Sequence, residues 1–234
     1  NCEIGRDVSF DALRAAHDAV FLAVGLGATN RLNIPGEDLE GVIDALHFIE
    51  KIKTRDWRSV PLGRTVAVIG AGNTAIDAVT QAKRLGAERV ILIYRRTEKD
   101  APAYDYEMEL ARKDGVEFMW QSSPVEILGD GRVAGLRVAD AAGLVTEIAC
   151  DQVIKAIGQQ KMASFFTDIA GVTVDEKGRV LVNDQMQTSN PKIFSGGDCA
   201  NGGAEAVDAS QMGKHAAQGI HETLMGETVS FAGS

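Results

Sequence analysis

Short apolar runs that end at glycine or at a polar turn alternate with amphipathic stretches along most of the chain. Such runs are typical of strands buried on both faces, whereas apolar residues at helical spacing are typical of amphipathic helices. The apolar runs predict strands at 19–24, 65–69, 116–120 and 152–157, and one that starts at 90. Helical spacing predicts helices at 10–16, 44–51, 74–85, 104–113 and 204–225. This alternation favours an α/β fold.

The pattern changes in the middle of the chain. Residues 125–128, 133–139 and 145–149 are short, glycine-punctuated strands of meander type. The sequence therefore predicts an antiparallel meander just before the buried strand at 152–157.

One apolar strand runs directly into the pattern G-x-G-x-x-A and then into a helical stretch. In this context Gly70 allows a tight turn, Gly72 lets the backbone approach a pyrophosphate, and Ala75 lets the helix pack closely on the strand. Asn73 and Thr74 are placed to hold the pyrophosphate, because the free N–H groups and positive end of a helix favour an anion. The motif predicts a dinucleotide site, and the alternative is an ordinary strand-turn-helix without a ligand.

The end of the next strand distinguishes the two nicotinamide dinucleotides. An NAD site places an acidic residue there, about 20 residues on, to accept from the ribose 2′-OH. Arg95 and Arg96 close this strand instead, and guanidinium groups suit a 2′-phosphate because their donors match its oxygens. We therefore expect NADPH rather than NADH. The alternative is a solvated basic strand end paired with Glu98 or Asp100.

The composition is that of an ordinary soluble protein, with 45% hydrophobic and 24% charged residues, and 234 residues leave room for two modest domains. No apolar run approaches the roughly 20 residues of a membrane span. The first residues do not form a signal peptide, so we expect a cytoplasmic protein. The net charge of −9, without a dense basic cluster, argues against nucleic acid as a partner.

The three cysteines and four histidines offer little further chemistry. The cysteines are far apart and provide no disulfide framework, redox pair or iron–sulfur ligand set, and Cys199 is expected to be a buried, inert thiol. His215 and His221 lie six positions apart on one predicted helix, which is not the spacing of a zinc pair. No metal site is expected.

Two strands end in the same way, as Ala-Val-Gly at Gly25 and as Ala-Ile-Gly at Gly158, and could be matching crossovers into and out of one domain. Near the C-terminal end, the sequence Gly196-Gly197-Asp198 follows a strand and precedes the last predicted helix. Asp198 is placed to accept hydrogen bonds from sugar-alcohol hydroxyls. The alternative is an aspartate that caps a helix or closes a turn.

Together these residues resemble the pyridine nucleotide and flavin oxidoreductases of the glutathione-reductase type, in which an NAD(P) domain is inserted in an FAD domain. Gly25 and Gly158 match the two crossover motifs, and Gly197 and Asp198 match the second flavin motif, whose aspartate contacts the ribityl chain. The resemblance implies a Rossmann-like NADP domain with its meander at 28–158. Partial FAD-binding segments are then expected at 1–27 and 159–234.

Further site residues follow from this resemblance. Gly158 is expected beside NADPH, and Gly25 and Gly197 beside FAD. The N–H groups of Glu205, Ala206 and Val207, at the start of the final helix, would face the flavin pyrimidine edge, where charge builds on reduction.

A narrower resemblance is carried by Ile34-Pro35-Gly36-Glu37-Asp38-Leu39-Glu40-Gly41-Val42 and by the stretches 72–77, 94–97 and 101–103. These look like the glutamate synthase small subunit and the NAD(P)H-binding subunit of bacterial dihydropyrimidine dehydrogenase, and 17–50 favours the latter. Neither an initiator Met nor the first FAD motif is in this sequence. We therefore expect a piece of a longer protein, inactive alone.

The implied task is hydride transfer from NADPH to FAD. Single electrons would then pass through iron–sulfur clusters, expected in an N-terminal part, to a larger catalytic partner subunit. Two alternatives stay open. One is the glutamate synthase small subunit itself, and the other is a non-catalytic module that senses NADPH or docks a partner.

Overall fold

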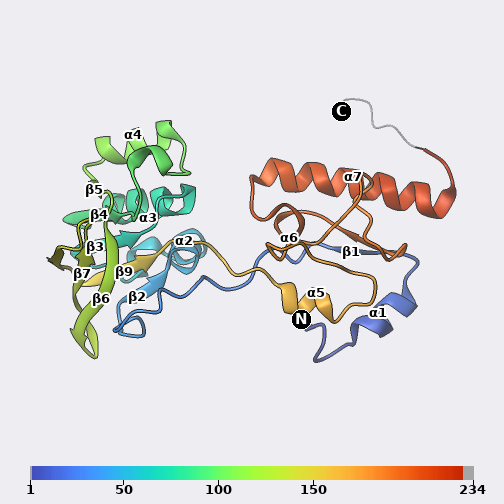
Figure 1. Cartoon of the computed structure of the whole chain (residues 1–234), viewed down its shortest axis with the longest axis horizontal. Helices are drawn as coiled ribbons and strands as arrows, with labels where there is room; N and C mark the ends of the chain where they lie inside the picture. Colours follow the sequence, from blue (N-terminus) through green and yellow to red (C-terminus); the bar gives the residue numbers. More distant parts are fainter. Residues whose placement is uncertain (1, 229–234) are drawn as a thin grey trace. The chain divides into compact units, whose positions relative to one another are not determined.

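The computed structural model describes residues 2–228 and divides the chain into two compact units. The inserted unit is Thr29–Gly158, and the discontinuous unit is formed by the chain up to Ala28 and from Gln159 onward. Each unit has its own strands (Figure 1). Each also has hydrophobic core residues of its own, in two clusters in the inserted unit and in another in the discontinuous unit.

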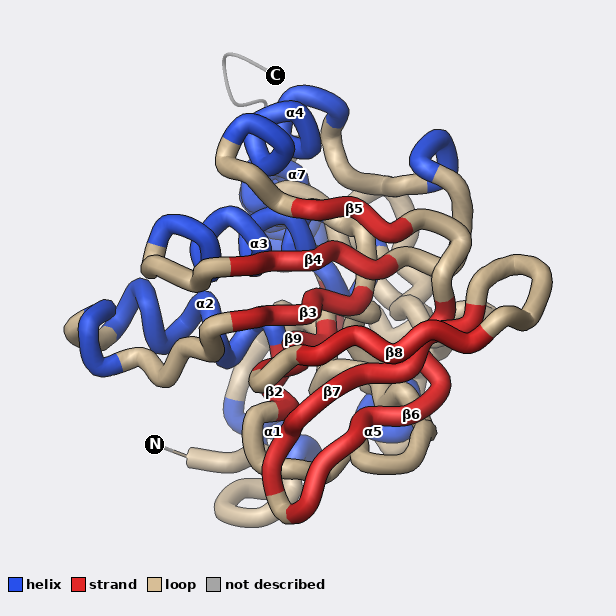
Figure 2. The backbone as a smooth tube through the Cα atoms, turned by 90° about the vertical axis from the view of Figure 1, so that its left-hand side faces the viewer, coloured by secondary structure: helices blue, strands red, loops and turns tan. Residues whose placement is uncertain are grey.

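The inserted unit is built around a five-stranded parallel sheet with the order β2-β9-β3-β4-β5 (Figure 2). Its strands are β2 (Val42–Asp44), β3 (Thr65–Ile69), β4 (Arg89–Ile93), β5 (Glu117–Met119) and β9 (Gln152–Lys155). The connecting helices are α2 (Ala45–Thr54), α3 (Asn73–Arg84) and α4 (Asp105–Lys113), with short 3₁₀ turns η1 (Trp57–Ser59) and η2 (Glu98–Asp100). Because β3 and β4 are parallel neighbours, the loops that follow them lie at the same edge of the sheet.

A second sheet, the antiparallel meander β6 (Ser123–Asp130), β7 (Arg132–Ala139) and β8 (Val145–Ala149), covers one face of the parallel sheet. Helices α2, α3 and α4 cover the other face (Figure 2). The parallel sheet therefore has a hydrophobic core on each face. Successive side chains of β3 point to opposite faces, so that Val66 and Val68 pack toward the helices while Ala67 and Ile69 pack toward the meander. The predicted α/β fold with a meander is confirmed.

The discontinuous unit has a two-stranded parallel sheet of β1 (Val20–Leu22) and β10 (Ile193–Ser195). Its helices are α1 (Phe10–Ala16), α5 (Ala163–Thr167), α6 (Asp198–Asn201) and α7 (Ala206–Met225). Leu22, Phe166 and Ile193 are among the buried residues of its core. None of the described helices is both long and apolar enough to cross a membrane.

The two segments that connect the units run beside each other. In the discontinuous unit, Gly27 N donates to Gln160 O and Gln160 N donates to Ala28 O, both at 2.8 Å. In the inserted unit, Asn30 N donates to Gly158 O at 2.9 Å. Gly158 adopts φ +80°, in the left-handed region that favours glycine.

The structure differs from the sequence-based prediction at several element ends. The final helix begins at 206 rather than 204, and a separate short helix, α6, precedes it. Gly202 and Gly203, with φ of +97° and +110°, interrupt the helical path between them. Strand β2 was not predicted, because its three residues immediately precede a helix and pair only with the distant β9.

Candidate functional site

The turn after β3 is too tight for any side chain at its first glycine. Gly70 has φ +131°, and a Cβ there would lie 2.2 Å from the carbonyl oxygen of Ala156. Its amide donates to the carbonyl of Ile93 at 3.0 Å, which ties the turn to the end of β4. The predicted function of Gly70 as a turn residue therefore has a direct steric reason.

Helix α3 begins at Asn73, directly after this turn. Its N-cap is Gly72, which has no side chain to cap the first turn. The opening N–H groups of a helix lack intrahelical acceptors, so Asn73 and Thr74 start a site suited to an anion. Ala75 is fully buried, as close packing of helix on strand requires. These residues fit a pyrophosphate.

The segment before α4 packs against the same turn. Ala103 N donates to Ala71 O, and Tyr104 N donates to Asn73 Oδ1, both at 3.1 Å. The Asn73 side-chain oxygen therefore holds this segment in place.

Arg95 and Arg96 follow β4 and are both exposed. Within the described part of the chain, neither forms an ion pair with Glu98 or Asp100. Arg96 is still close enough for its charge to contribute to the lowered pKa of Asp100, after the two hydrogen bonds from Thr97. The two guanidinium groups thus keep their donors available to a ligand.

Gly158 lies apart from the glycine turn but is connected to it through the backbone. It follows Ala156 by two residues, and the Ala156 carbonyl is the atom that faces Gly70. The two segments therefore share one edge of the sheet, where β3 and β9 are parallel neighbours.

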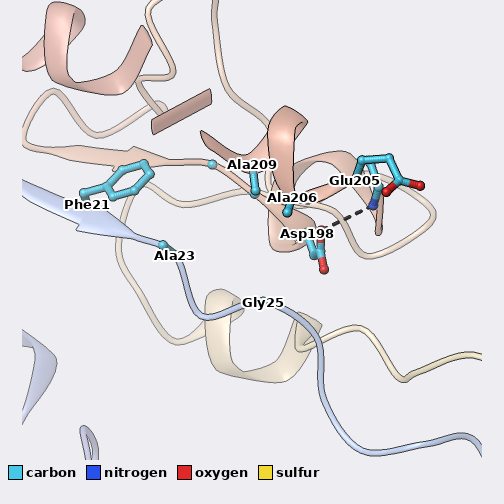
Figure 3. Close-up of a pocket in the computed structure, with 10 residues that line it drawn as sticks. Phe21, Ala23, Gly25, Asp198, Glu205, Ala206 and Ala209 are labelled. Carbon is cyan, nitrogen blue, oxygen red and sulfur yellow. Dashed lines mark hydrogen bonds between the residues drawn. The ribbon is translucent and has the colours of Figure 1, made fainter. Parts of the chain in front are cut away.

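The discontinuous unit contains a cavity of about 400 Å³ (Figure 3). Its lining includes Phe21, Gly25, Gly197, Asp198, Glu205 and Ala206. It therefore brings together most of the residues that the sequence assigns to FAD. Val207 is not among the lining residues and is 73% exposed.

Backbone conformation and close packing explain why glycine occupies two positions that line this cavity. Gly197 has φ +72°, and a Cβ on Gly196 would lie 3.1 Å from the ring of Phe21. A side chain at Gly197 would strain the backbone, and one at Gly196 would press on the ring of Phe21, which lines the cavity. Gly25, with φ +68°, has open space at its Cβ position.

Carboxylates surround the start of α7. Asp198 Oδ1 accepts from Ala204 N at 3.3 Å, and Glu205 N donates to Asp208 Oδ2 at 3.0 Å (Figure 3 shows the former). The Glu205 amide is therefore used within the chain, and Ala206 is the remaining predicted amide at the cavity wall.

Sequence reasoning missed a buried acidic residue. Glu37 is 5% exposed, and its carboxylate accepts from Leu32 N at 2.8 Å, Asn33 N at 2.9 Å and Lys155 Nζ at 3.0 Å. Burial alone would raise the pKa of Glu37, but these donors together hold it below its usual value. Lys155, at the end of β9, also pairs with Asp44 at 3.3 Å.

The neighbouring glycine was the available signal. A Cβ on Gly36 would lie 2.0 Å from the carbonyl oxygen of Ile127 on β6. The stretch around Ile34-Pro35-Gly36, which carries the narrower resemblance, therefore connects the inserted unit's meander to its parallel sheet.

Two of the cysteines are buried. Cys199 is 3% exposed, and its Sγ lies 3.3 Å from Ser195 Oγ. Cys150 is buried as well, and this burial, with a smaller contribution from Asp151, raises its pKa to about 12. Among residues 2–228, no cluster of three or more histidine, cysteine or acidic side chains is placed to hold a metal ion.

Residues 4–213 match the model of the pyridine nucleotide-disulphide oxidoreductase family. The chain belongs to this family. Its predicted resemblance to the glutathione-reductase type is thereby confirmed at the level of the family.

Two relatives of similar sequence are longer than this chain. The chain is 37% identical to the glutamate synthase (NADPH) small chain of Escherichia coli, covering 96% of this chain and 54% of that protein. It is 32% identical to the NADP(+)-dependent formate dehydrogenase subunit beta of Moorella thermoacetica, covering 98% of this chain and 35% of that protein. The chain thus spans about half or less of these relatives.

Two solved structures share the fold of this chain. Thioredoxin reductase of T. acidophilum superposes with a TM-score of 0.77 at 22% identity, over 88% of this chain and 66% of that one. Thioredoxin reductase of Lactococcus lactis superposes with a TM-score of 0.75 at 26% identity, over 89% of this chain and 67% of that one.

Proposed function

We propose that the inserted unit binds NADPH and delivers its hydride to FAD, which the discontinuous unit holds in part. One observation carries this proposal. The start of α3, which follows the glycine N-cap Gly72, lies at the same edge of the sheet as the arginines after β4, because β3 and β4 are neighbouring parallel strands. Among the residues that the structure describes, these arginines form no ion pair with Glu98 or Asp100. That arrangement suits a ligand with a pyrophosphate and a second phosphate on its adenosine ribose.

Each residue has a role in binding or orientation. The amides that open α3 hold the pyrophosphate, and Arg95 and Arg96 bind the 2′-phosphate. In the discontinuous unit, Asp198 accepts from ribityl hydroxyls, while Gly25 and Gly197 let the backbone approach the cofactor. Bound FAD supplies a two-electron acceptor that can release electrons singly, so the protein needs to position rather than to donate protons.

We further propose that the parent protein is an electron-input subunit. The names of its relatives, a glutamate synthase small chain and a formate dehydrogenase subunit beta, support a role beside a larger catalytic partner. Iron–sulfur clusters in an N-terminal part and a dihydropyrimidine dehydrogenase partner remain predictions from the sequence. A glutamate synthase small subunit fits the relatives equally well.

The test is calorimetric titration of this chain with NADPH and, separately, with NADH. A preference for NADPH of tenfold or more, about 1.4 kcal/mol, is expected because only NADPH carries the 2′-phosphate. Arg95→Ala should weaken NADPH binding and leave NADH binding nearly unchanged.

Arg89→Ala is the matched control, because Arg89 lies at the opposite end of β4 and pairs with Glu117 at 2.7 Å. It should leave both affinities unchanged. Equal affinity of the wild-type chain for both dinucleotides would contradict the arginine assignment, and failure to bind either would contradict a working nucleotide site in this chain.

A further inference from the structure

Arginines of the inserted unit are mostly paired with carboxylates. Ion pairs within 3.0 Å join Arg64 to Glu88, Arg84 to Asp114, Arg89 to Glu117 and Arg137 to Glu126. Among residues 2–228, Arg95 and Arg96 form no such pair, although Glu98 and Asp100 follow them closely in the chain. The availability of these two guanidinium groups therefore needs a structural cause.

Asp100 is held by Thr97, the residue that directly follows the arginines. Its Oδ2 accepts from Thr97 Oγ1 at 2.6 Å and from Thr97 N at 3.2 Å, and the bond from Thr97 N belongs to a capping box at the start of η2. These two bonds are the main reason why the pKa of Asp100 lies below its usual value. The carboxylate is thus ionised at neutral pH but directed toward Thr97.

Glu98 is held by a different element. It pairs with Arg112 on α4, and the Arg112 guanidinium in turn lies 4.8 Å above the ring of Phe118 on β5. Helix α4 therefore supplies the partner of the second carboxylate.

We propose that Thr97 and Arg112 are specificity-determining positioning residues: by binding Asp100 and Glu98, they keep Arg95 and Arg96 available for a ribose 2′-phosphate. This inference rests on the proposed NADPH site and adds the reason for its selectivity. If either carboxylate were released, it would compete with the phosphate as an internal anion, while a ligand without that phosphate would not be affected. The competing interaction is that of an exposed ion pair.

The test compares NADPH and NADH affinities by calorimetry for Thr97→Val and Arg112→Met at one fixed ionic strength. Thr97→Val removes the hydroxyl donor at nearly constant shape, and Arg112→Met keeps an apolar chain over Phe118. Each should lower the NADPH affinity by about fivefold, the upper range for an exposed ion pair. NADH affinity should stay within twofold, on the order of the scatter of surface substitutions, which also shows that the unit is folded.

Neutralising the released carboxylate should restore selectivity. Thr97→Val combined with Asp100→Asn, and Arg112→Met combined with Glu98→Gln, should regain the wild-type ratio of affinities. Arg84→Met is the matched control, because it frees Asp114 from another ion pair of the same unit and should not change the ratio.

The outcomes separate this inference from the proposed function. A wild-type chain without NADPH preference would contradict both. If the wild-type chain prefers NADPH and both single variants keep that preference, only the inference about Thr97 and Arg112 is overturned. The same holds if the single variants weaken NADH binding as much as they weaken NADPH binding.

Discussion

At the turn after β3, two glycines two positions apart meet different surroundings. A Cβ on Gly70 would overlap the carbonyl of Ala156, whereas a Cβ on Gly72, at φ −85°, would find only Pro102 Cγ at 3.8 Å. The first glycine is therefore required by the fold, and the second only by what approaches the turn.

Gly70→Ala is expected to lower the free energy of unfolding of the inserted unit by about 3 kcal/mol, through strain and overlap. Gly72→Ala should cost no more than about 1 kcal/mol, the difference between glycine and alanine at an N-cap, yet weaken NADPH by blocking backbone approach. Urea denaturation followed by tryptophan fluorescence measures the stability of both variants, since Trp57 and Trp120 lie in the inserted unit. Equal loss of stability in the two variants would contradict this distinction.

The glycine turn was predictable from sequence because its strand, glycines and helix are contiguous. The availability of Arg95 was only half predictable. Thr97 and Asp100 form a local capping pattern, but the pairing of Glu98 depends on where α4 packs. A sequence shows which charges are close in the chain, and only the fold shows which of them point at one another.

At the scale of elements, the segment that leads into β2 connects the two layers of strands. Gly36 packs on β6, and Glu37 pairs with Lys155 at the end of β9, 118 residues away in the chain. A contact of that separation leaves no periodic pattern, so it cannot be predicted from this stretch of sequence. The strands themselves were predictable because apolar runs mark them locally.

Glu37→Gln should destabilise the inserted unit by about 3 kcal/mol at neutral pH, because Lys155 loses its buried partner. The pKa of Glu37 is lowered in the folded state. Its contribution to stability is therefore complete above the ordinary glutamate pKa of about 4.3 and is lost as the pH falls below it toward the folded value.

Tryptophan-detected urea unfolding at a series of pH values measures the contribution of Glu37 to the free energy of unfolding. The difference in this free energy between wild type and Glu37→Gln should shrink progressively in acid. A difference that stays constant down to about pH 3, well below the glutamate range, would show that Glu37 contributes by packing rather than by charge.

At the scale of the whole molecule, the inserted unit has complete layers of its own: helices, parallel sheet and meander, with two cores that involve no residue outside Thr29–Gly158. We expect residues 29–158 expressed alone to fold. Their tryptophan-detected urea midpoint should match that of the full chain, because both tryptophans report on this unit alone. A molten or aggregated product would show that the discontinuous unit is needed for its stability.

The paired connecting segments have a consequence for how such a protein can change. Asn30 and Gly158 meet through a backbone hydrogen bond, and Gly27 and Ala28 meet Gln160 in the same way on the other side. A module whose entrance and exit adjoin can be exchanged as a cassette, because its host needs only a short turn to close the gap. Selection could thus replace the reductant that feeds the enzyme by swapping one continuous stretch of gene, while the residues around Asp198 stay as they are.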